Sequence, residues 1–525
     1  MNSRRTRSPG AAPLGTATPD AVVVGAGAAG AALAARLSED PDRQVLLLEA
    51  GPAHRSEADF GPALLDARLV PGARTGHPAV DLWPARLTPE RPWAVPRGRV
   101  AGGSTTVNGG YFVRARRADF DRWSAAGSPA WAWERVLPFL RALETDLDHG
   151  DSAVHGGSGP VRVCRSRLTH PAEKAFLDAA LAVGHVADPD KNDQASAGVG
   201  PVPSNAVDGV RRNAALSYLT GEVLARPNLR VVGDCRVLRI LFAGRRATGV
   251  LVEYRGHRTA VDAGTVVVSA GALASAKLLQ LSGVGPRADL ERLGIPLVRD
   301  APAVGAGFSD HPQIILECGT QDDWGEPADN WMGSCLHLEL GGGLGQVEVL
   351  QSLVPVAGLV RGEVRVPCAP MAFLVSALAP RPTGRVLVKS ADPDVAPVVE
   401  HGYLGTPSDR ARLRGAVRAA VEVLAASAFV EVGSPAPVVA PAVLKDDRAL
   451  DAWIRDALGT SQHTCGTVPM GPEGSPGAVV DEFGRVHGLN GLVVADTSIL
   501  PDAPQRGPAA TAVLVGEIVA DALRH

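Results

Sequence analysis

A histidine and a cysteine stand two positions apart in the segment SQHTCGTVPMG, residues 461–471. His463 could ligate a metal, activate Cys465 as a nucleophile, accept a proton, or be an ordinary loop histidine. Nothing in the chain is typical of acyl transfer, and buried cysteines are common, so the nucleophile pair is not favoured. Proton transfer and the loop histidine stay open, because they depend on the rest of the chain.

No metal site is predicted from the sequence. The six cysteines are scattered without a CxxC pair, so their spacing does not favour a zinc site. Asp310 and His311 are adjacent in VGAGFSDHP, but neighbouring residues rarely converge on one ion without a third ligand.

The clearest ligand signal is a glycine-rich turn near the N-terminus. In DAVVVGAGAAGAALAARL the run AVVV predicts a buried strand, and a helix follows the glycines Gly25, Gly27 and Gly30. This strand–turn–helix order is the one that binds the pyrophosphate of a dinucleotide. Glu49 ends the next predicted strand, QVLLLE, where a carboxylate can accept hydrogen bonds from ribose hydroxyls. The fingerprint predicts dinucleotide binding but leaves NAD and FAD open.

Two later segments could also face a ligand. Residues 97–114, RGRVAGGSTTVNGGYFVR, are rich in Gly, Ser and Thr, and such a loop can wrap a ligand with backbone N–H groups. Residues 265–283 repeat the strand–turn–helix order, and Gly271 stands where strand meets helix.

The remaining elements predict two kinds of architecture. Strands are expected within 228–255, and GLVVADTSILP at 491–501 predicts a strand that runs into Asp496. Residues 313–460 contain HLEL, GQVEVLQSLVPV and GRVLVKS, which are typical of antiparallel strands, together with two amphipathic helices. The chain therefore predicts a dinucleotide domain made of separated segments and a sheet-plus-helix domain that covers the ligand.

Composition excludes several classes of function. The 525 residues exceed one simple core, so two or more domains are expected. A net charge of −4 gives no electrostatic case for nucleic acid, and no apolar run reaches the ~20 residues of a membrane span. Residues 1–18 are expected to be a disordered tail without an export signal. A cytoplasmic protein with reduced thiols is predicted, with an association at the membrane periphery left open.

The chain resembles the glucose–methanol–choline (GMC) family of FAD-dependent alcohol oxidases and dehydrogenases, from about residue 19 to 523. The resemblance rests on six segments in this order, which are VVVGAGAAGAALAARLSEDPDRQVLLLEAG, RGRVAGGSTTVNGGYFVR, GALASAKLLQLSGVGP, VGAGFSDHP, HTCGTVPMG and VHGLNGLVVADTSILP. It implies FAD rather than NAD.

The resemblance also assigns roles to residues. Gly25, Gly27, Gly30 and Glu49 would hold the ADP half, and Asp496 would lie at the pyrophosphate end. Residues expected along the flavin are Gly102, Gly103, Ser104 and Asn108. Val237 would bind adenine through its backbone. His463 matches the histidine of the family motif His-x-x-Gly-Thr, which favours proton transfer over an ordinary loop histidine.

Two departures from the family pattern matter. Some members attach FAD covalently through a histidine at the position of Val107, so FAD is expected to be non-covalent here. The family's second catalytic His or Asn lies three positions before the threonine of the last helix, and that position is Pro508. Proline offers no side-chain donor or acceptor. Candidates for the missing partner are Gln462, Asn108, Gln505 and Arg506.

The segment RGPAATAV with Pro508 resembles the branch linked to mycofactocin, a peptide-derived redox cofactor. Such an enzyme would oxidise reduced mycofactocin, a small-molecule substrate, and pass electrons toward the respiratory chain. Two alternatives remain, an FAD-dependent oxidase or dehydrogenase of primary alcohols and a hydroxynitrile-lyase-like enzyme whose FAD has no redox role.

The expected fold is α/β, α+β overall. A Rossmann-like FAD-binding domain is expected from residues 19–160, 195–312 and 461–525. Residues 161–194 and 313–460 are expected to form the substrate-binding domain, with an antiparallel sheet and helices.

Overall fold

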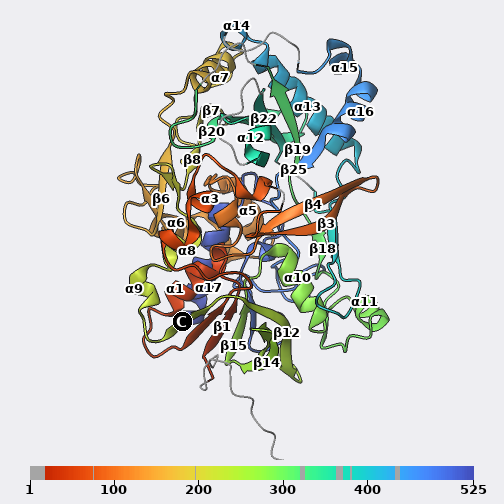
Figure 1. The fold of residues 1–525 in the computed structure, drawn as a ribbon. Coiled ribbons are helices and arrows are strands. Elements are labelled where there is room, and N and C mark those ends of the chain that lie inside the picture. Colours follow the sequence, from red (N-terminus) through yellow and green to blue (C-terminus); the bar gives the residue numbers. More distant parts are fainter. Residues whose placement is uncertain are drawn as a thin grey trace, which may run out of the picture.

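The computed structural model describes residues 18–74, 76–194, 197–319, 325–361, 370–378, 381–431 and 438–525. Apart from its last position, the tail expected at residues 1–18 lies outside the described residues. The chain forms two lobes, one around a parallel sheet and one around an antiparallel sheet, which lie at the bottom and top of Figure 1. Among the described helices, none combines the length and apolar character needed to cross a bilayer.

A five-stranded parallel sheet forms the centre of the lower lobe, in the order β11-β2-β1-β15-β26. Its strands come from distant parts of the chain, and their bounds are β1 Ala21–Val24, β2 Val45–Leu48, β11 Leu229–Val232, β15 Thr265–Val268 and β26 Leu492–Val494. These strands are largely buried on both faces, which explains their continuous apolar runs. The expected Rossmann-like unit made of discontinuous segments is confirmed.

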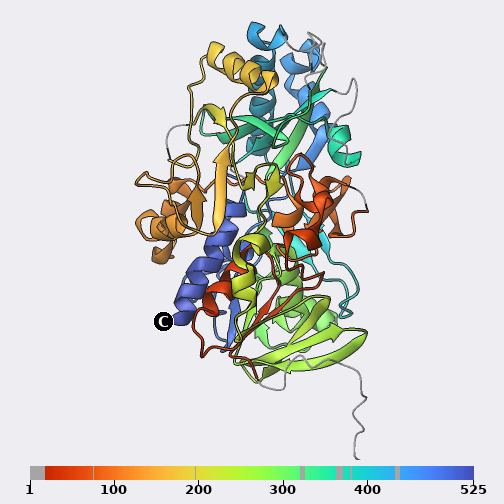
Figure 2. The same ribbon diagram turned by 60° about the vertical axis from the view of Figure 1, so that its left-hand side comes forward.

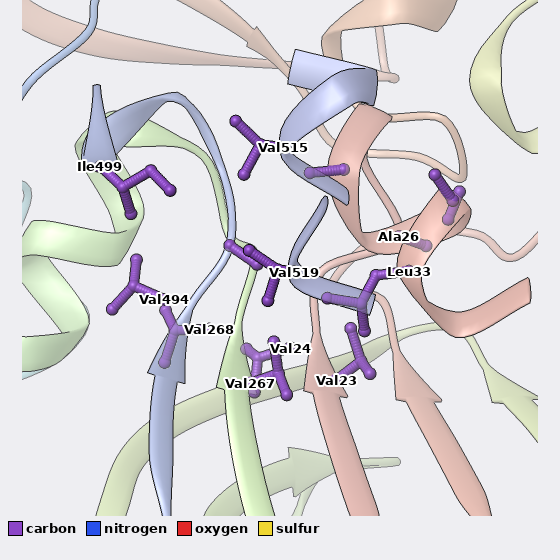
Figure 3. Packing of buried hydrophobic residues seen from close by; sticks show 14 of the residues in the cluster. Val23, Val24, Ala26, Leu33, Val267, Val268, Val494, Ile499, Val515 and Val519 are labelled. Carbon is purple, nitrogen blue, oxygen red and sulfur yellow. The ribbon is translucent and has the colours of Figure 1, made fainter. Parts of the chain in front are cut away.

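Helices α1 (Ala28–Leu37) and α17 (Ala509–Arg524) pack together over this sheet. Figure 3 shows Val519 of α17 between Leu33 and the strand valines, with Val515 farther from the strands. The close approach requires glycine, because a Cβ on Gly516 would lie 2.4 Å from the Ala29 carbonyl oxygen. The last helix of the chain therefore fixes the first, and with it the glycine turn that precedes α1.

A six-stranded sheet forms the upper lobe, in the order β25-β19-β22-β21-β20-β7 with every pairing antiparallel. Its strands are β7 Val199–Pro201, β19 Pro312–Cys318, β20 Met332–Leu340, β21 Gly345–Ser352, β22 Met371–Ala377 and β25 Leu458–Thr460. The helices in its core cluster are α7 Pro171–Ala182, α13 Pro407–Leu424 and α16 Asp447–Ala457. The strand expected at HLEL is confirmed in β20. The one expected at GQVEVLQSLVPV is confirmed in β21 as far as Ser352, and LVPV lies beyond its end.

Smaller elements complete the two lobes. A second sheet, ordered β18-β23-β24-β3-β4, contains β3 Val80–Thr88, β4 Arg91–Gly98, β18 Ala306–Phe308, β23 Gly384–Leu387 and β24 Val398–Glu400. The strand expected at GRVLVKS is thus β23, which lies in this sheet and not in the six-stranded one. In Figure 2 the sheet of β12 Cys235–Ala243, β13 Arg246–Tyr254 and β14 His257–Asp262 closes the lower end. The helix α10, Ala272–Leu281, follows β15.

Candidate active site

A cavity of about 1030 Å³ is bordered by residues of both lobes. It brings together twelve of the predicted residues, which are Gly25, Gly27, Glu49, Gly103, Ser104, Asn108, Val237, Gly271, Gln462, His463, Asp496 and Pro508. Gly30 and Gly102 do not line it and have packing roles. A Cβ on Gly30 would lie 2.0 Å from the Gly25 carbonyl oxygen, and one on Gly102 would lie 2.4 Å from Thr106 Oγ1.

The glycine turn opens one end of the cavity at the start of α1. Gly27 is the N-cap residue and supplies no side chain, so the first N–H groups of the helix are left for a ligand. A Cβ on Gly27 would have only the Gly103 Cα near it, at 4.0 Å, and so would project into open space. Glu49 accepts the N–H groups of Ala26 and Gly51, each at 2.9 Å, which fixes its carboxylate beside the turn.

Asp496 joins three segments on the cavity wall. Its Oδ2 accepts the Gly271 N–H at 2.9 Å and the Ser275 hydroxyl at 2.5 Å, and its Oδ1 accepts the Ser498 N–H at 2.8 Å. Burial raises the pKa of Asp496, and these hydrogen bonds act against that rise. The carboxylate thereby fixes the start of α10 against the segment after β26.

The loop that follows β4 borders the middle of the cavity. It contains the short helix α4 (Ser104–Val107), and Asn108 then accepts the Gly110 N–H at 3.0 Å through its side-chain oxygen. Val107 is 3% exposed and belongs to the lower core cluster. The side chain at this position is therefore aliphatic and packed into the core, with no atom that could attach a cofactor covalently.

Asp310 anchors the segment that carries His463. Its Oδ1 accepts the backbone N–H groups of His311 and His463, each at 2.7 Å, and its Oδ2 accepts the Thr464 hydroxyl at 2.8 Å. Burial opposes ionisation of Asp310, but His401, whose Nε2 lies 3.5 Å from Oδ2, and the charge of Arg97 hold its pKa well below the usual range. A buried carboxylate thus ties the two histidine segments together.

The backbone beside His463 is held in an unusual conformation. Gln462 has φ 64°, a left-handed value that non-glycine residues seldom adopt. Its N–H donates to Thr460 Oγ1 at 3.1 Å, and its carbonyl oxygen accepts from Arg97 Nη1 at 3.1 Å. Arg97 also donates to the Thr464 hydroxyl at 2.7 Å. Such conformations persist where the surroundings fix them, often at active sites.

His463 lies against a second histidine. His311 Nδ1 and His463 Nδ1 are 2.8 Å apart, so one ring donates to the other. Burial lowers the pKa of His463 to about 4, and burial followed by the proximity of His463 lowers the pKa of His311 to about 3. Both rings are therefore neutral at pH 7. From the sequence, His311 was examined only as a possible metal ligand. Its contact with His463 joins residues 152 positions apart, and no local sequence pattern indicates it.

The other nitrogen of His463, Nε2, has no hydrogen-bond partner among the described residues, and His463 lines the cavity. Gly507 separates this ring from Tyr111, since a Cβ placed on Gly507 would lie 3.4 Å from His463 Cε1 and 2.9 Å from the Tyr111 ring. Pro508 follows at the N-cap of α17 and also lines the cavity. Tyr111 was not among the predicted residues.

Two of the four candidates for the missing partner lie away from the cavity. Gln462 and Asn108 line it, as does Pro508, whereas Gln505 and Arg506 do not. The Gln505 backbone N–H donates to Asp119 at 2.9 Å, and Arg506 is 1% exposed with its Nη1 on Gln346 at 2.7 Å. Neither Gln505 nor Arg506 therefore replaces the missing partner by direct contact with the cavity.

Cys465 is buried behind His463 in a backbone pairing with Ser309. Burial raises the pKa of its thiol well above the usual range, with Asp310 acting in the same direction. A thiol in this state is a poor nucleophile, which agrees with the interpretation that Cys465 and His463 are not a catalytic pair.

Comparison with known proteins places this geometry in context. Family models described as GMC oxidoreductase match residues 19–313 and 380–516. The chain is 39% identical over 503 residues to an uncharacterized GMC-type oxidoreductase of Rhodococcus erythropolis, covering 95% of this chain and 97% of the relative. It is 31% identical over 538 residues to an oxygen-dependent choline dehydrogenase of Photobacterium profundum, covering 96% and 93%.

Among solved structures, pyridoxine 4-oxidase from Mesorbium loti superposes with a TM-score of 0.88 at 27% identity. The match covers 97% of this chain and 99% of that protein. Both lobes therefore have a counterpart in a solved structure.

Proposed function

The chain belongs to the GMC oxidoreductase family and is an FAD-dependent oxidoreductase of alcohol groups, and from that premise we propose that it oxidises reduced mycofactocin. Electrons would leave toward an acceptor of the respiratory chain. One observation carries the proposal: His463 is a neutral base at the cavity wall, and Pro508 stands where the family's second catalytic residue is expected. A quinol-like hydroxyl is acidic enough to be deprotonated with one base.

The residues of the cavity fit FAD. The open space at Gly27 and the uncapped start of α1 suit a pyrophosphate, and the fixed carboxylate of Glu49 suits a ribose. Residues that we propose to hold the rest of the cofactor are Gly25, Gly103, Ser104, Asn108, Val237, Gly271 and Asp496. Val107 supports non-covalent attachment. We also propose that residues 19–160, 195–312 and 461–525 form the FAD-binding domain. Residues 161–194 and 313–460 would form the substrate-binding domain.

When bound, FAD would supply the acceptor for the two electrons that the substrate loses. His463 takes the hydroxyl proton on Nε2, which requires its Nδ1–H to donate to His311. His311, neutral and fully buried, accepts that hydrogen bond and fixes the ring orientation. Asp310 holds both backbones, so the base is positioned before the substrate arrives.

The substrate is tested by anaerobic mixing of the FAD-loaded enzyme with reduced mycofactocin. We expect fast bleaching of the flavin band at ~450 nm, and little hydrogen peroxide when air is admitted. Bleaching by simple primary alcohols at a higher rate, with no bleaching by reduced mycofactocin, would reject this substrate.

A second candidate is the oxidation of a primary alcohol. It is favoured by the similarity to proteins named oxygen-dependent choline dehydrogenase and pyridoxine 4-oxidase. Stoichiometric hydrogen peroxide during steady turnover of such an alcohol in air would support this candidate over the first.

The pH dependence of flavin reduction follows from the state of His463. The base must be neutral, and burial lowers its pKa to about 4, against the opposing effect of Asp310. The reduction rate is therefore expected to be constant at higher pH and to fall about tenfold per unit below about pH 4. Anaerobic stopped-flow measurements across pH check this. An inflection near ~6.5, the ordinary histidine value, would contradict the buried neutral base.

A further inference from the structure

A polar cluster outside the His463 segment borders the same cavity. The Tyr111 hydroxyl donates to Glu348 Oε2 at 2.6 Å, and His337 Nε2 lies 2.9 Å from the same oxygen. Tyr111 and Glu348 line the cavity, and Glu348 is 4% exposed. The two residues that contact Glu348 come from different elements, since His337 lies on β20 and Tyr111 lies within segment 97–114. Neither the predicted site residues nor the mechanism uses this cluster.

One oxygen of Glu348 is open. Its Oε2 is engaged twice, whereas Oε1 has no hydrogen-bond partner in the described part of the chain and is not sealed inside the protein. Because Glu348 borders the cavity, Oε1 is the acceptor that it offers to a bound molecule. A ligand that fills the cavity would displace water from this oxygen, and a donor on the ligand would replace the lost hydrogen bond.

A metal ion is the other occupant to weigh, because Cys335, His337 and Glu348 have ligand atoms within 4.8 Å of one another. Two observations disfavour His337 as a ligand of a metal ion. Arg506, Lys191 and Arg116 all act on its ring as positive charges. Among the described residues its Nδ1 has no hydrogen-bond partner, whereas metal-binding histidines use their second nitrogen to fix the ring.

Apolar side chains of the cluster around Tyr111 also line the cavity, and they are Trp331, Leu350, Leu359 and Leu374. A Cβ placed on Gly507 would lie 2.9 Å from the Tyr111 ring and 3.4 Å from the His463 ring, so the two rings are close together. The base and the carboxylate that holds the Tyr111 hydroxyl therefore border one cavity. A ligand that reaches both would have an apolar body with a polar group at each end.

We propose that Glu348, held in place by Tyr111 and His337, anchors a substrate subsite that selects alcohols with a second hydrogen-bond donor, a hydroxyl or an ammonium group. The proposal rests on the proposed function, since it places the oxidised alcohol at His463. Glu348 is the recognition residue, and Tyr111 is a positioning residue that acts through Glu348.

The subsite is tested with three benzamides that cannot be oxidised at an alcohol carbon. The probes are 4-hydroxybenzamide, 4-(aminomethyl)benzamide and 4-methylbenzamide, titrated into the oxidised FAD-loaded enzyme while the flavin spectrum is followed. At least one donor-bearing probe is expected to bind about 10-fold tighter than the methyl probe. Tighter binding of the hydroxyl probe or of the ammonium probe identifies the donor. Equal affinity of all three would overturn the subsite.

Variants of Glu348 and Tyr111 test whether Glu348 causes the tighter binding of the donor-bearing probes. In Glu348→Gln the preference is expected to fall to about threefold or less, because an amide group replaces one of the two carboxylate oxygens. The matched control is Glu339→Gln, an exposed residue of the adjacent strand β20 that should keep the full preference. Tyr111→Phe should weaken the preference about threefold by releasing the carboxylate, and it decides the matter if Glu348→Gln fails to load FAD. An unchanged preference in the loaded variants contradicts the assignment.

Failure of the subsite and failure of the proposed function are separable. The rate of flavin reduction is measured with 4-hydroxybenzyl, 4-(aminomethyl)benzyl and 4-methylbenzyl alcohol, and with reduced mycofactocin. Donor preference among the benzamides without flavin reduction by any alcohol would keep the subsite and reject the function. Flavin reduction without any donor preference would keep the function and reject the subsite.

Discussion

Replacing His463 with alanine is expected to slow flavin reduction by about 100-fold or more at saturating substrate. His463 lines the cavity with Nε2 unengaged, and its pKa near 4 keeps it neutral at pH 7. Without this base the hydroxyl proton must pass to water, since Pro508 has no acceptor in its side chain. Stopped-flow absorbance under anaerobic conditions measures the rate directly.

The control for this variant is His257→Ala, which removes an exposed histidine on β14 and should leave the rate unchanged. Flavin content and the oxidised spectrum of both variants establish that the cofactor is bound. A rate for loaded His463→Ala within about threefold of the unmodified enzyme would contradict the role of His463 as the base.

Asp310→Ala is expected to destabilise the protein by at least about 3 kcal/mol. The substitution leaves the His311 and His463 N–H groups and the Thr464 hydroxyl without their common acceptor. It also removes the negative charge that faces buried Arg97. Denaturant unfolding of the FAD-loaded protein, followed by tryptophan fluorescence, measures the loss.

Asp42→Ala, which removes an exposed carboxylate, is the matched control and should change stability by no more than about 0.5 kcal/mol. If Asp310→Ala unfolds at the same denaturant concentration as this control, Asp310 is not the anchor of the two histidine segments. Because the anchor also positions the base, the loaded Asp310→Ala enzyme should reduce its flavin more slowly.

Local sequence patterns were sufficient to predict most elements of the fold. The strand–turn–helix order around Gly25 and the antiparallel strands β20 and β21 follow from short-range apolar spacing, which is visible in the sequence. The assembly of the parallel sheet from distant segments could be expected because the strand pattern returns at 265 and at 492. The placement of β23 in a separate sheet has no such signal, since strand partners are a property of the whole fold.

The candidate site was predictable only where a motif carries it. His463 and the glycines lie in contiguous segments, but the His311–His463 contact joins residues 152 positions apart. The Tyr111–Glu348 hydrogen bond joins residues 237 positions apart, and neither belongs to a spacing that predicts contact. Arg506 was a candidate for the missing partner because it lies close to Pro508 in sequence. Its side chain is buried in the protein and does not line the cavity.

The central claim is that this cavity couples removal of a hydroxyl proton at His463 to two-electron oxidation of the substrate by FAD. Anaerobic titration of the FAD-loaded enzyme with its alcohol substrate, with product counted by mass spectrometry, tests it most directly. The account predicts complete bleaching at ~450 nm with one oxidised product formed for each FAD reduced. Product formed while the flavin stays oxidised, as expected of a hydroxynitrile-lyase-like enzyme, would contradict it.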